Sequence, residues 1–269
     1  MNKGIAYFIG SLTTLIAIRA LWGYSPFQGS ASMIPSSFTK VIALGFPFIF
    51  VLRKDIRNVF IALCLLVMFY GGETISWGCV FITFLIWFRK SKMLTILILT
   101  VGLILPFAGP KFLRISSNPI SDMRSRIELY DTTLNKWTKV WSGHYEFCRF
   151  SALPENQPEN RPDKRWLHTA ESDFIQGLYE FGVIRMAVIM LVLLLPLFYL
   201  KLNSPLNTAI FSGYVCMLFQ SLFSFPFHRM ITGILGSIII MLAYGETYED
   251  ITSSFISMCK RNAFRLRVF

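Results

Sequence analysis

The sequence predicts an all-α, polytopic integral membrane protein with about eight transmembrane helices and a helical cap outside the membrane. Two observations carry this prediction. Hydrophobic residues make up 54% of the 269 residues and charged residues only 15%, whereas about 25% of the residues in soluble domains are charged. The apolar residues also form long blocks rather than an alternating pattern. Together these features exclude a soluble enzyme, a disordered chain and a repeat solenoid.

Spanning helices are expected wherever about 20 mostly apolar residues follow one another. We assign them to 4–23, 34–52, 56–72, 74–88, 93–108, 183–200, 206–225 and 230–246. The first follows Lys3 and is interpreted as a retained signal anchor rather than a cleaved signal peptide. The second and third have apolar cores of only about a dozen residues each, so one re-entrant hairpin is the alternative to two spans.

Basic residues in the short loops predict the orientation. With the N-terminus inside, the cytoplasmic side receives Lys3, the turns 53–57 and 89–92, Lys201 and the basic tail 247–269. The short outer loops are 24–33, the turn ending at Glu73, and 227–229. This asymmetry follows the positive-inside rule in every short loop but the last, and it predicts that both termini are cytoplasmic.

The net charge of +11 comes from 26 Lys and Arg against 15 Asp and Glu. Such a charge would suit nucleic acid, but basic cytoplasmic loops explain it more simply in a membrane protein. We therefore expect the membrane, and no nucleic acid, as a partner. The five cysteines lie in separate segments, so we expect neither a disulfide framework nor a metal site.

The polar segment 109–182 is too long for a simple connector between the helices of 1–108 and those of 183–246. A helix is expected over 121–140, because apolar or aromatic residues recur there every three to four positions at Ile127, Tyr130, Leu134 and Trp137. The segment therefore predicts a small folded cap, and it is where we look for chemistry.

A second cap helix is expected to begin at Thr169. The Thr169 side chain suits an N-cap. Glu171 and Asp173 would lie in the first turn, where the positive end of the helix dipole stabilises carboxylates. Gly182 lies where the chain turns into the sixth span.

Ionisable residues gather at the expected outer surface rather than inside the spans. They are Glu73, Arg114, Arg124, Arg126, His144, His168, Glu171, Asp173, Glu180, Arg185, His228 and Arg229. Guanidinium groups beside a histidine can bind pyrophosphate and remove a proton from a hydroxyl. Contact with lipid head groups is the alternative for each arginine. A structural or solvated role is favoured for His144, and a catalytic role for His168.

Four motifs then resemble the O-antigen ligase and polymerase superfamily. The stretch 168–184, with its Glu180-Phe-Gly182 end, is similar to the family's His helix, which ends in Glu-x-Gly before a span. Ser125-Arg126-Ile-Glu-Leu-Tyr130 resembles its Arg helix. The segment 141–144 lies where the family has a Gly-rich turn, and 225–229 resembles its Pro-His element. The motifs keep the family's order over about 70–245.

The resemblance implies a glycosyltransferase of the bacterial inner membrane without metal or cofactor. Such an enzyme moves a glycan from undecaprenyl pyrophosphate to lipid A-core or another glycan acceptor on the periplasmic face, so the cap would be periplasmic. His168 would be the general base and Arg126 the catalytic ligand of the departing pyrophosphate. Further substrate-binding residues implied are Arg124, Arg185, His228, Arg229, Glu180 and Glu73. Ligase and polymerase remain alternatives.

Two departures from the family keep another class of function open. Family members commonly have ten to twelve spans, against about eight here, and the stretch 72–76 lacks the arginine of the family's Ser-Arg or Thr-Arg pair. The alternative is a non-catalytic, degenerate membrane component or lipid-carrier-binding scaffold of polysaccharide biosynthesis. A transporter is third, because we find neither ionisable residues at mid-depth nor two related halves.

Overall fold

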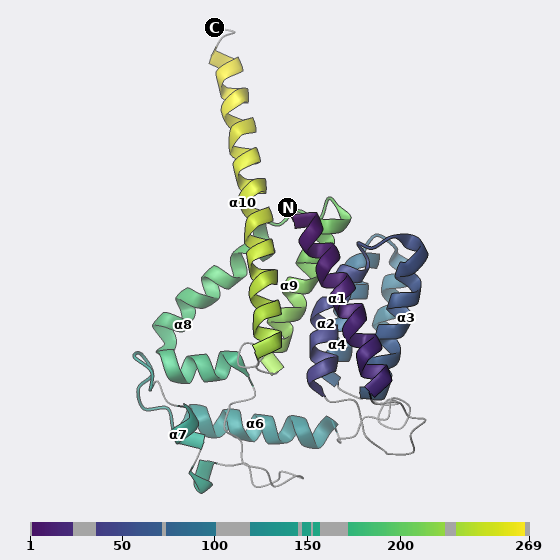
Figure 1. Cartoon of the computed structure of the whole chain (residues 1–269). Helices are drawn as coiled ribbons and strands as arrows, with labels where there is room; N and C mark the ends of the chain where they lie inside the picture. Colours follow the sequence, from purple (N-terminus) through teal and green to yellow (C-terminus); the bar gives the residue numbers. More distant parts are fainter. Residues whose placement is uncertain are drawn as a thin grey trace.

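The computed structural model describes residues 2–23, 36–71, 74–100, 119–144, 147–151, 153–156, 172–223 and 230–266. All regular secondary structure within these ranges is helical, which confirms the all-α prediction (Figure 1). The elements are α1 (Asn2–Gly23), α2 (Ser36–Ile49), α3 (Lys54–Gly71), α4 (Thr74–Phe88), α6 (Pro119–Asn135), α7 (Phe147–Ser151), the short 3₁₀ helix η2 (Pro154–Asn156), α8 (Asp173–Tyr199), α9 (Pro205–Phe223) and α10 (Met230–Leu266). A further helical stretch covers 92–100.

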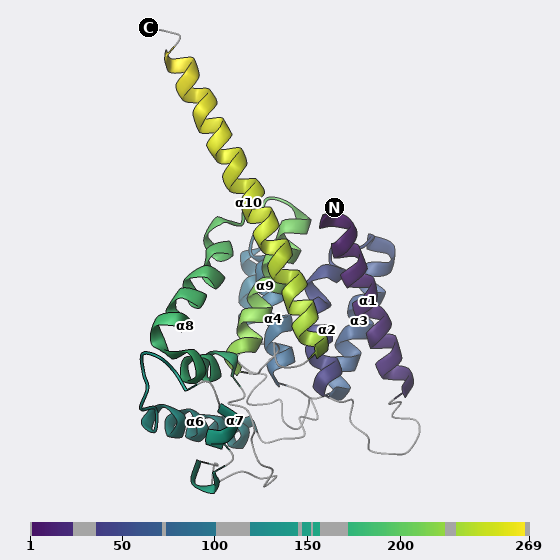
Figure 2. The same cartoon turned by 60° about the vertical axis from the view of Figure 1, so that its left-hand side comes forward.

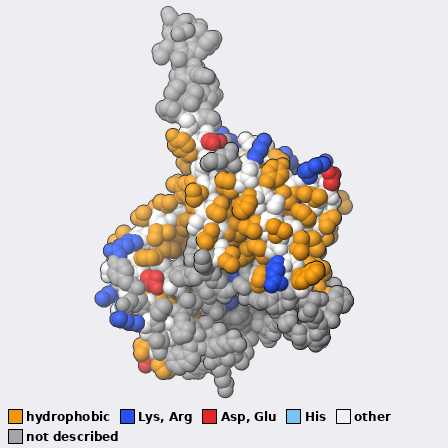
Figure 3. Space-filling model, viewed as in Figure 1, with side chains coloured by type: hydrophobic (Ala, Val, Ile, Leu, Met, Phe, Trp, Pro, Cys, Tyr) orange, Lys and Arg blue, Asp and Glu red, His pale blue; other side chains and the backbone are white. Residues whose placement is uncertain are grey.

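Four of these helices are long and apolar enough to cross a membrane. They comprise Lys3–Trp22, Asp173–Tyr199, Pro205–Phe223 and Ile231–Glu249, and the shorter apolar helices Phe38–Ile49 and Ile75–Phe88 accompany them. Hydrophobic side chains cover most of the described bundle surface seen in Figure 3, with Lys and Arg toward its edges. These features agree with a multi-pass membrane protein.

Helix α2 is the centre of the bundle, although its apolar core in the sequence is short. It packs against α1, α3, α4, α9 and α10, and Ile42, Leu44 and Phe46 are fully buried. Gly45 allows α1 to approach, because a Cβ there would lie only 1.8 Å from Thr13 Oγ1. Small residues at helix contacts let backbones come close, as is common in membrane bundles. The region 36–71 therefore forms two packed helices.

Helix α8 is bent at Gly182, whose φ of 77° and ψ of 169° interrupt the helix. The bend lies where the sequence predicted the turn into the sixth span. It separates a first part, 173–181, from an apolar second part, 183–199. The predicted N-cap at Thr169 is wrong for this helix: Ser172 is the N-cap, and the Ile175 N–H donates to its Oγ at 3.4 Å. Thr169 and Glu171 lie outside the described residues.

The cap helix α6 ends earlier than the predicted 121–140, and only part of the predicted stripe, Tyr130 and Trp137, is half-buried. Leu129 and Thr133 are buried, whereas Ile127 and Leu134 of the predicted stripe are 57% and 45% exposed. Which side chains of α6 are buried depends on the surface that the helix packs against. The spacing of apolar residues within the helix does not predict that surface. Beyond the helix, the Lys136 ammonium donates to Asn156 Oδ1 at 2.5 Å and so connects α6 with η2.

Helix α10 continues well past the predicted boundary between span and tail at residue 246. Its 37 residues correspond to about 55 Å at 1.5 Å per residue, longer than the ~30 Å hydrocarbon core of a bilayer. Figures 1 and 2 show it projecting from the end of the bundle at which the N-terminus lies, whereas α6 and α7 lie at the opposite end. We call that opposite end the cap end.

Candidate functional site

Two glycines from different sequence motifs meet at the base of the cap. Gly143 and Gly182 have φ values of 76° and 77°. A Cβ on Gly143 would lie 2.2 Å from Glu180 O, and one on Gly182 would lie 2.3 Å from Trp141 O. The Val183 N–H donates to Val140 O at 2.8 Å across the same contact. We call this contact between 140–144 and 179–183 the glycine crossing, and it joins the cap to the bend of α8.

Glu180 is fixed beside the glycine crossing by two donors. Its Oε1 accepts from Gln176 Nε2 at 2.9 Å and from the Phe147 N–H at 3.4 Å. The second bond places the Glu180 carboxylate at the N-terminus of α7, where the positive end of the helix dipole stabilises its negative charge. A small aromatic core of Phe147, Phe150 and Tyr179 packs on the same part of the cap. Glu180 is therefore held in one position relative to α7 and α8.

His144 packs into the cap as a neutral ring. It stacks on Tyr179 with centroids 4.7 Å apart, and its Nε2 accepts the Lys139 N–H at 3.2 Å. Desolvation by burial, together with the nearby charge of Lys139, lowers the pKa of His144 from its ordinary value of 6.5. This geometry agrees with the structural or solvated role favoured for His144.

Acid is therefore expected to loosen the glycine crossing. The neutral form of His144 is favoured by the fold, so its contribution to stability is present above the ordinary pKa of 6.5 and is lost as the pH falls through the lowered pKa. Hydrogen exchange at the Lys139 amide should show protection falling several-fold between about pH 7.5 and pH 5. In His144→Phe, which keeps a ring but cannot titrate, protection should not change with pH. Equal pH dependence in both proteins would contradict this explanation.

Two side chains, one from α6 and one from the start of α8, donate hydrogen bonds to the last turn of α9. The half-buried Arg126 of α6 donates from its guanidinium to Phe223 O, and the buried Ser172 Oγ at the start of α8 donates to Ser221 O at 3.3 Å. The last carbonyls of a helix lack intrahelical donors and lie at the negative end of its dipole. An arginine and a hydroxyl are therefore suitable partners there. Arg126 of α6 and Ser172 at the start of α8 thus converge on one helix end.

The sequence reasoning missed a group of buried polar residues near the cap ends of α2, α4 and α9. Lys40 is only 6% exposed and Gln220 is fully buried, and Gln220 Nε2 donates to Lys40 O at 3.2 Å. The same amide lies 3.6 Å from Cys79 Sγ. The sequence did contain a signal for this group. Lys40 is an ionisable residue inside a predicted span, and such a residue is a functional candidate by default.

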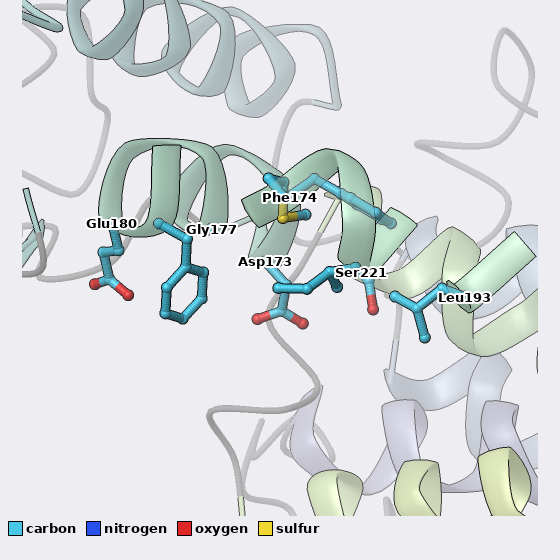
Figure 4. Close-up of a pocket in the computed structure, with 9 residues that line it drawn as sticks. Asp173, Phe174, Gly177, Glu180, Leu193 and Ser221 are labelled. Carbon is cyan, nitrogen blue, oxygen red and sulfur yellow. The ribbon is translucent and has the colours of Figure 1, made fainter. Parts of the chain in front are cut away.

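A cavity of about 300 Å³ lies inside the bend of α8 (Figure 4). Asp173, Phe174, Gly177, Glu180 and Phe181 line it from the first part of the helix. Met186, Ile189 and Leu193 line it from the second part, and Ser221 from α9. The cavity therefore reaches the same last turn of α9 on which Arg126 and Ser172 dock.

The remaining predicted site residues divide into two groups. Arg124 on α6 and Arg185 on α8 are exposed. The predicted residues Glu73, Arg114, His168, His228 and Arg229 lie outside the described residues. Within the described ranges, no group of three or more His, Cys, Asp or Glu residues is arranged to hold a metal ion.

Comparison with known proteins gives no match: no family model, no curated protein and no solved structure matches this chain.

Proposed function

We propose that this chain is a membrane glycosyltransferase that moves a glycan from undecaprenyl pyrophosphate to an acceptor, as an O-antigen ligase or a polysaccharide polymerase. The observation that carries the proposal is the convergence of Arg126 and Ser172 on the last turn of α9. His168 precedes Ser172 by four residues in the sequence, and His228 and Arg229 follow soon after Phe223. The docking thus supports a site that combines an imidazole with several guanidinium groups.

The proposed topology has eight spans in the bacterial inner membrane. They are α1 to α4, the segment that contains 92–100, the second part of α8, α9 and α10. The basic turns 53–57 and 89–92 would lie in the cytoplasm with both termini. The cap, on the opposite end of the bundle from the N-terminus, would then be periplasmic, where lipid-linked glycans meet their acceptors.

The proposed reaction forms one carbon–oxygen bond and breaks another, and it transfers one proton. His168 takes the proton of an acceptor hydroxyl, whose oxygen attacks the anomeric carbon of the donor glycan. The bond from that carbon to the pyrophosphate oxygen breaks, and undecaprenyl pyrophosphate leaves with the electron pair. Arg126 neutralises the charge that grows on the pyrophosphate. Because pyrophosphate is a good leaving group, this scheme uses one base and no general acid.

One observation favours the second candidate, a non-catalytic scaffold that binds the lipid carrier. The Arg126 guanidinium already donates to Phe223 O, so it connects the cap to the bundle whether or not it meets a substrate. The two candidates differ in what His168 does. A scaffold requires the cap but not the imidazole.

A deletion strain separates these functions through the banding of its lipopolysaccharide or capsule on a gel. Loss of attached polysaccharide with free lipid-linked polymer indicates a ligase, and a single capped repeat indicates a polymerase. His168→Ala should fail to restore the bands while still accumulating in the membrane, whereas the matched histidine variant His144→Phe should restore them. Normal bands from His168→Ala, combined with loss when 119–182 is deleted, would favour the scaffold.

A further inference from the structure

Helix α8 contacts α9 on both sides of its bend, and a cavity lies between the two contacts. Near the cap, the Ser172 Oγ at the start of α8 donates to Ser221 O of α9 at 3.3 Å. Farther along α8, Leu193 O accepts the hydroxyl of Tyr214 from α9 at 2.5 Å. Ser221 and Leu193 also line the cavity, whose volume is about 300 Å³ (Figure 4). The cavity is therefore bounded by a contact at either end.

A proline explains why a third helix joins the second contact. Pro196 lies inside α8 and has no N–H, so the carbonyl four residues earlier, Val192 O, lacks its helical donor. The Tyr244 hydroxyl of α10 donates to Val192 O instead. In a membrane a freed backbone carbonyl needs such a partner from a neighbouring helix. The contacts at both ends thus keep α8 from moving onto α9 and closing the cavity.

The surface of the cavity is almost wholly apolar. Phe174 lines it from the first part of α8, and Met186 and Ile189 line it from the second part. Glu180 also lines it, but its carboxylate already accepts two hydrogen bonds. Water finds too few partners in an apolar cavity, which takes up apolar molecules instead. If the cavity stayed empty, its walls would lose their dispersion contacts on one side. The expected occupant is therefore a hydrocarbon group.

The bilayer is the nearest source of such groups. Ile189 lines the cavity and is also 38% exposed. Val188 and Leu191 beside it are 57% and 68% exposed, on a helix that is long and apolar enough to cross a membrane. In a membrane these side chains face lipid chains, which are as apolar as leucine. A lipid chain can thus reach the cavity past Ile189 without crossing a polar surface.

We infer that this cavity binds one acyl chain of a membrane phospholipid, which packs between the two parts of α8 and supports the bend. Met186 suits such a ligand, because its flexible thioether fills irregular gaps. Gly177 leaves room for Met186, since a Cβ there would lie 2.9 Å from Met186 Sδ. The phospholipid is a structural ligand of the bundle. The inference therefore goes beyond the proposed function and does not depend on it.

Photolabelling of the full-length protein in phosphatidylcholine nanodiscs tests the inference. The probe is phosphatidylcholine with a photoreactive diazirine in the middle of one acyl chain, and mass spectrometry locates the labelled residue. Phe174 should carry the label. Ile189→Trp should fill the cavity and lower the labelling of Phe174 about tenfold. Leu191→Trp, the same change on the exposed face, should leave it unchanged. Ile189→Ala should also keep the label, which separates filling of the cavity from loss of the isoleucine.

Native mass spectrometry of the detergent-purified protein gives a second readout. One retained phospholipid is expected in the wild-type protein and in Leu191→Trp, and none in Ile189→Trp. An unlabelled Phe174 in the wild-type protein, or undiminished labelling in Ile189→Trp, would overturn the inference. Displacement of the probe by an equal amount of undecaprenyl phosphate would also overturn it, because the cavity would then belong to the lipid carrier. Labelling as expected in a protein that transfers no glycan would refute the proposed function alone.

Discussion

Replacing Arg126 with alanine is expected to lower glycan transfer by at least about 100-fold, the usual effect of removing a donor that stabilises charge in the transition state. The half-buried guanidinium lies at the end of α9 and donates to Phe223 O. The measurement is the rate of glycan transfer per molecule of membrane-inserted protein.

Arg124→Ala is the matched control for this prediction. Arg124 lies on the same helix two residues earlier, but it is exposed, so its removal should change the rate far less. Arg126→Lys tests whether the shape of the guanidinium group matters. Lysine keeps a positive charge but loses the planar fork that holds pyrophosphate with two bonds. Transfer by Arg126→Ala at the level of Arg124→Ala would show that Arg126 only connects the cap to the bundle.

Gly182→Ala is expected to have the largest effect on stability. The new Cβ would lie 2.3 Å from Trp141 O and 2.8 Å from Gly143 N, both backbone atoms that no rotamer change can move away. A non-glycine residue at a φ of 77° adds about 1–3 kcal/mol of strain. We expect the midpoint of thermal unfolding in detergent to fall by about 5 °C or more.

Two further glycine variants make that result specific. Gly143→Ala should lower the midpoint similarly, because its Cβ would lie 2.2 Å from Glu180 O across the same contact. Gly4→Ala should not lower it, because nothing lies within 4 Å of its Cβ. Equal midpoints for Gly4→Ala and Gly182→Ala would mean that the glycine crossing does not hold the cap to α8.

The helices could be predicted from the sequence because long apolar blocks and chain breakers are local signals. Gly182 was placed at a turn for this reason, and α8 bends there. The N-cap of α8 was harder to predict, because Thr169 and Ser172 both carry suitable hydroxyls. Ser172 is the residue whose Oγ also reaches α9 through Ser221 O, and this tertiary contact is invisible in a local pattern.

The assembly of the site could not be predicted from the sequence, because it depends on contacts between distant segments. The sequence assigned Gly143 and Gly182 to separate motifs, but a linear pattern does not report that their backbones meet. Arg126 was identified as a candidate, whereas its acceptor, Phe223 O, belongs to a helix 97 residues away. The burial of Lys40 could not be predicted from the sequence, because it depends on α2 being surrounded by other helices.

Transfer by the purified protein tests the proposed glycosyltransferase activity most directly. Full-length protein in proteoliposomes is given undecaprenyl-pyrophosphate-linked glycan with a lipid A-core or glycan acceptor, and both glycosylated acceptor and released undecaprenyl pyrophosphate are measured. The proposed glycan transfer requires equal amounts of the two products from the wild-type protein and neither from Arg126→Ala or His168→Ala. Wild-type protein that forms neither product, or a His168→Ala variant that forms both at the wild-type rate, would contradict it.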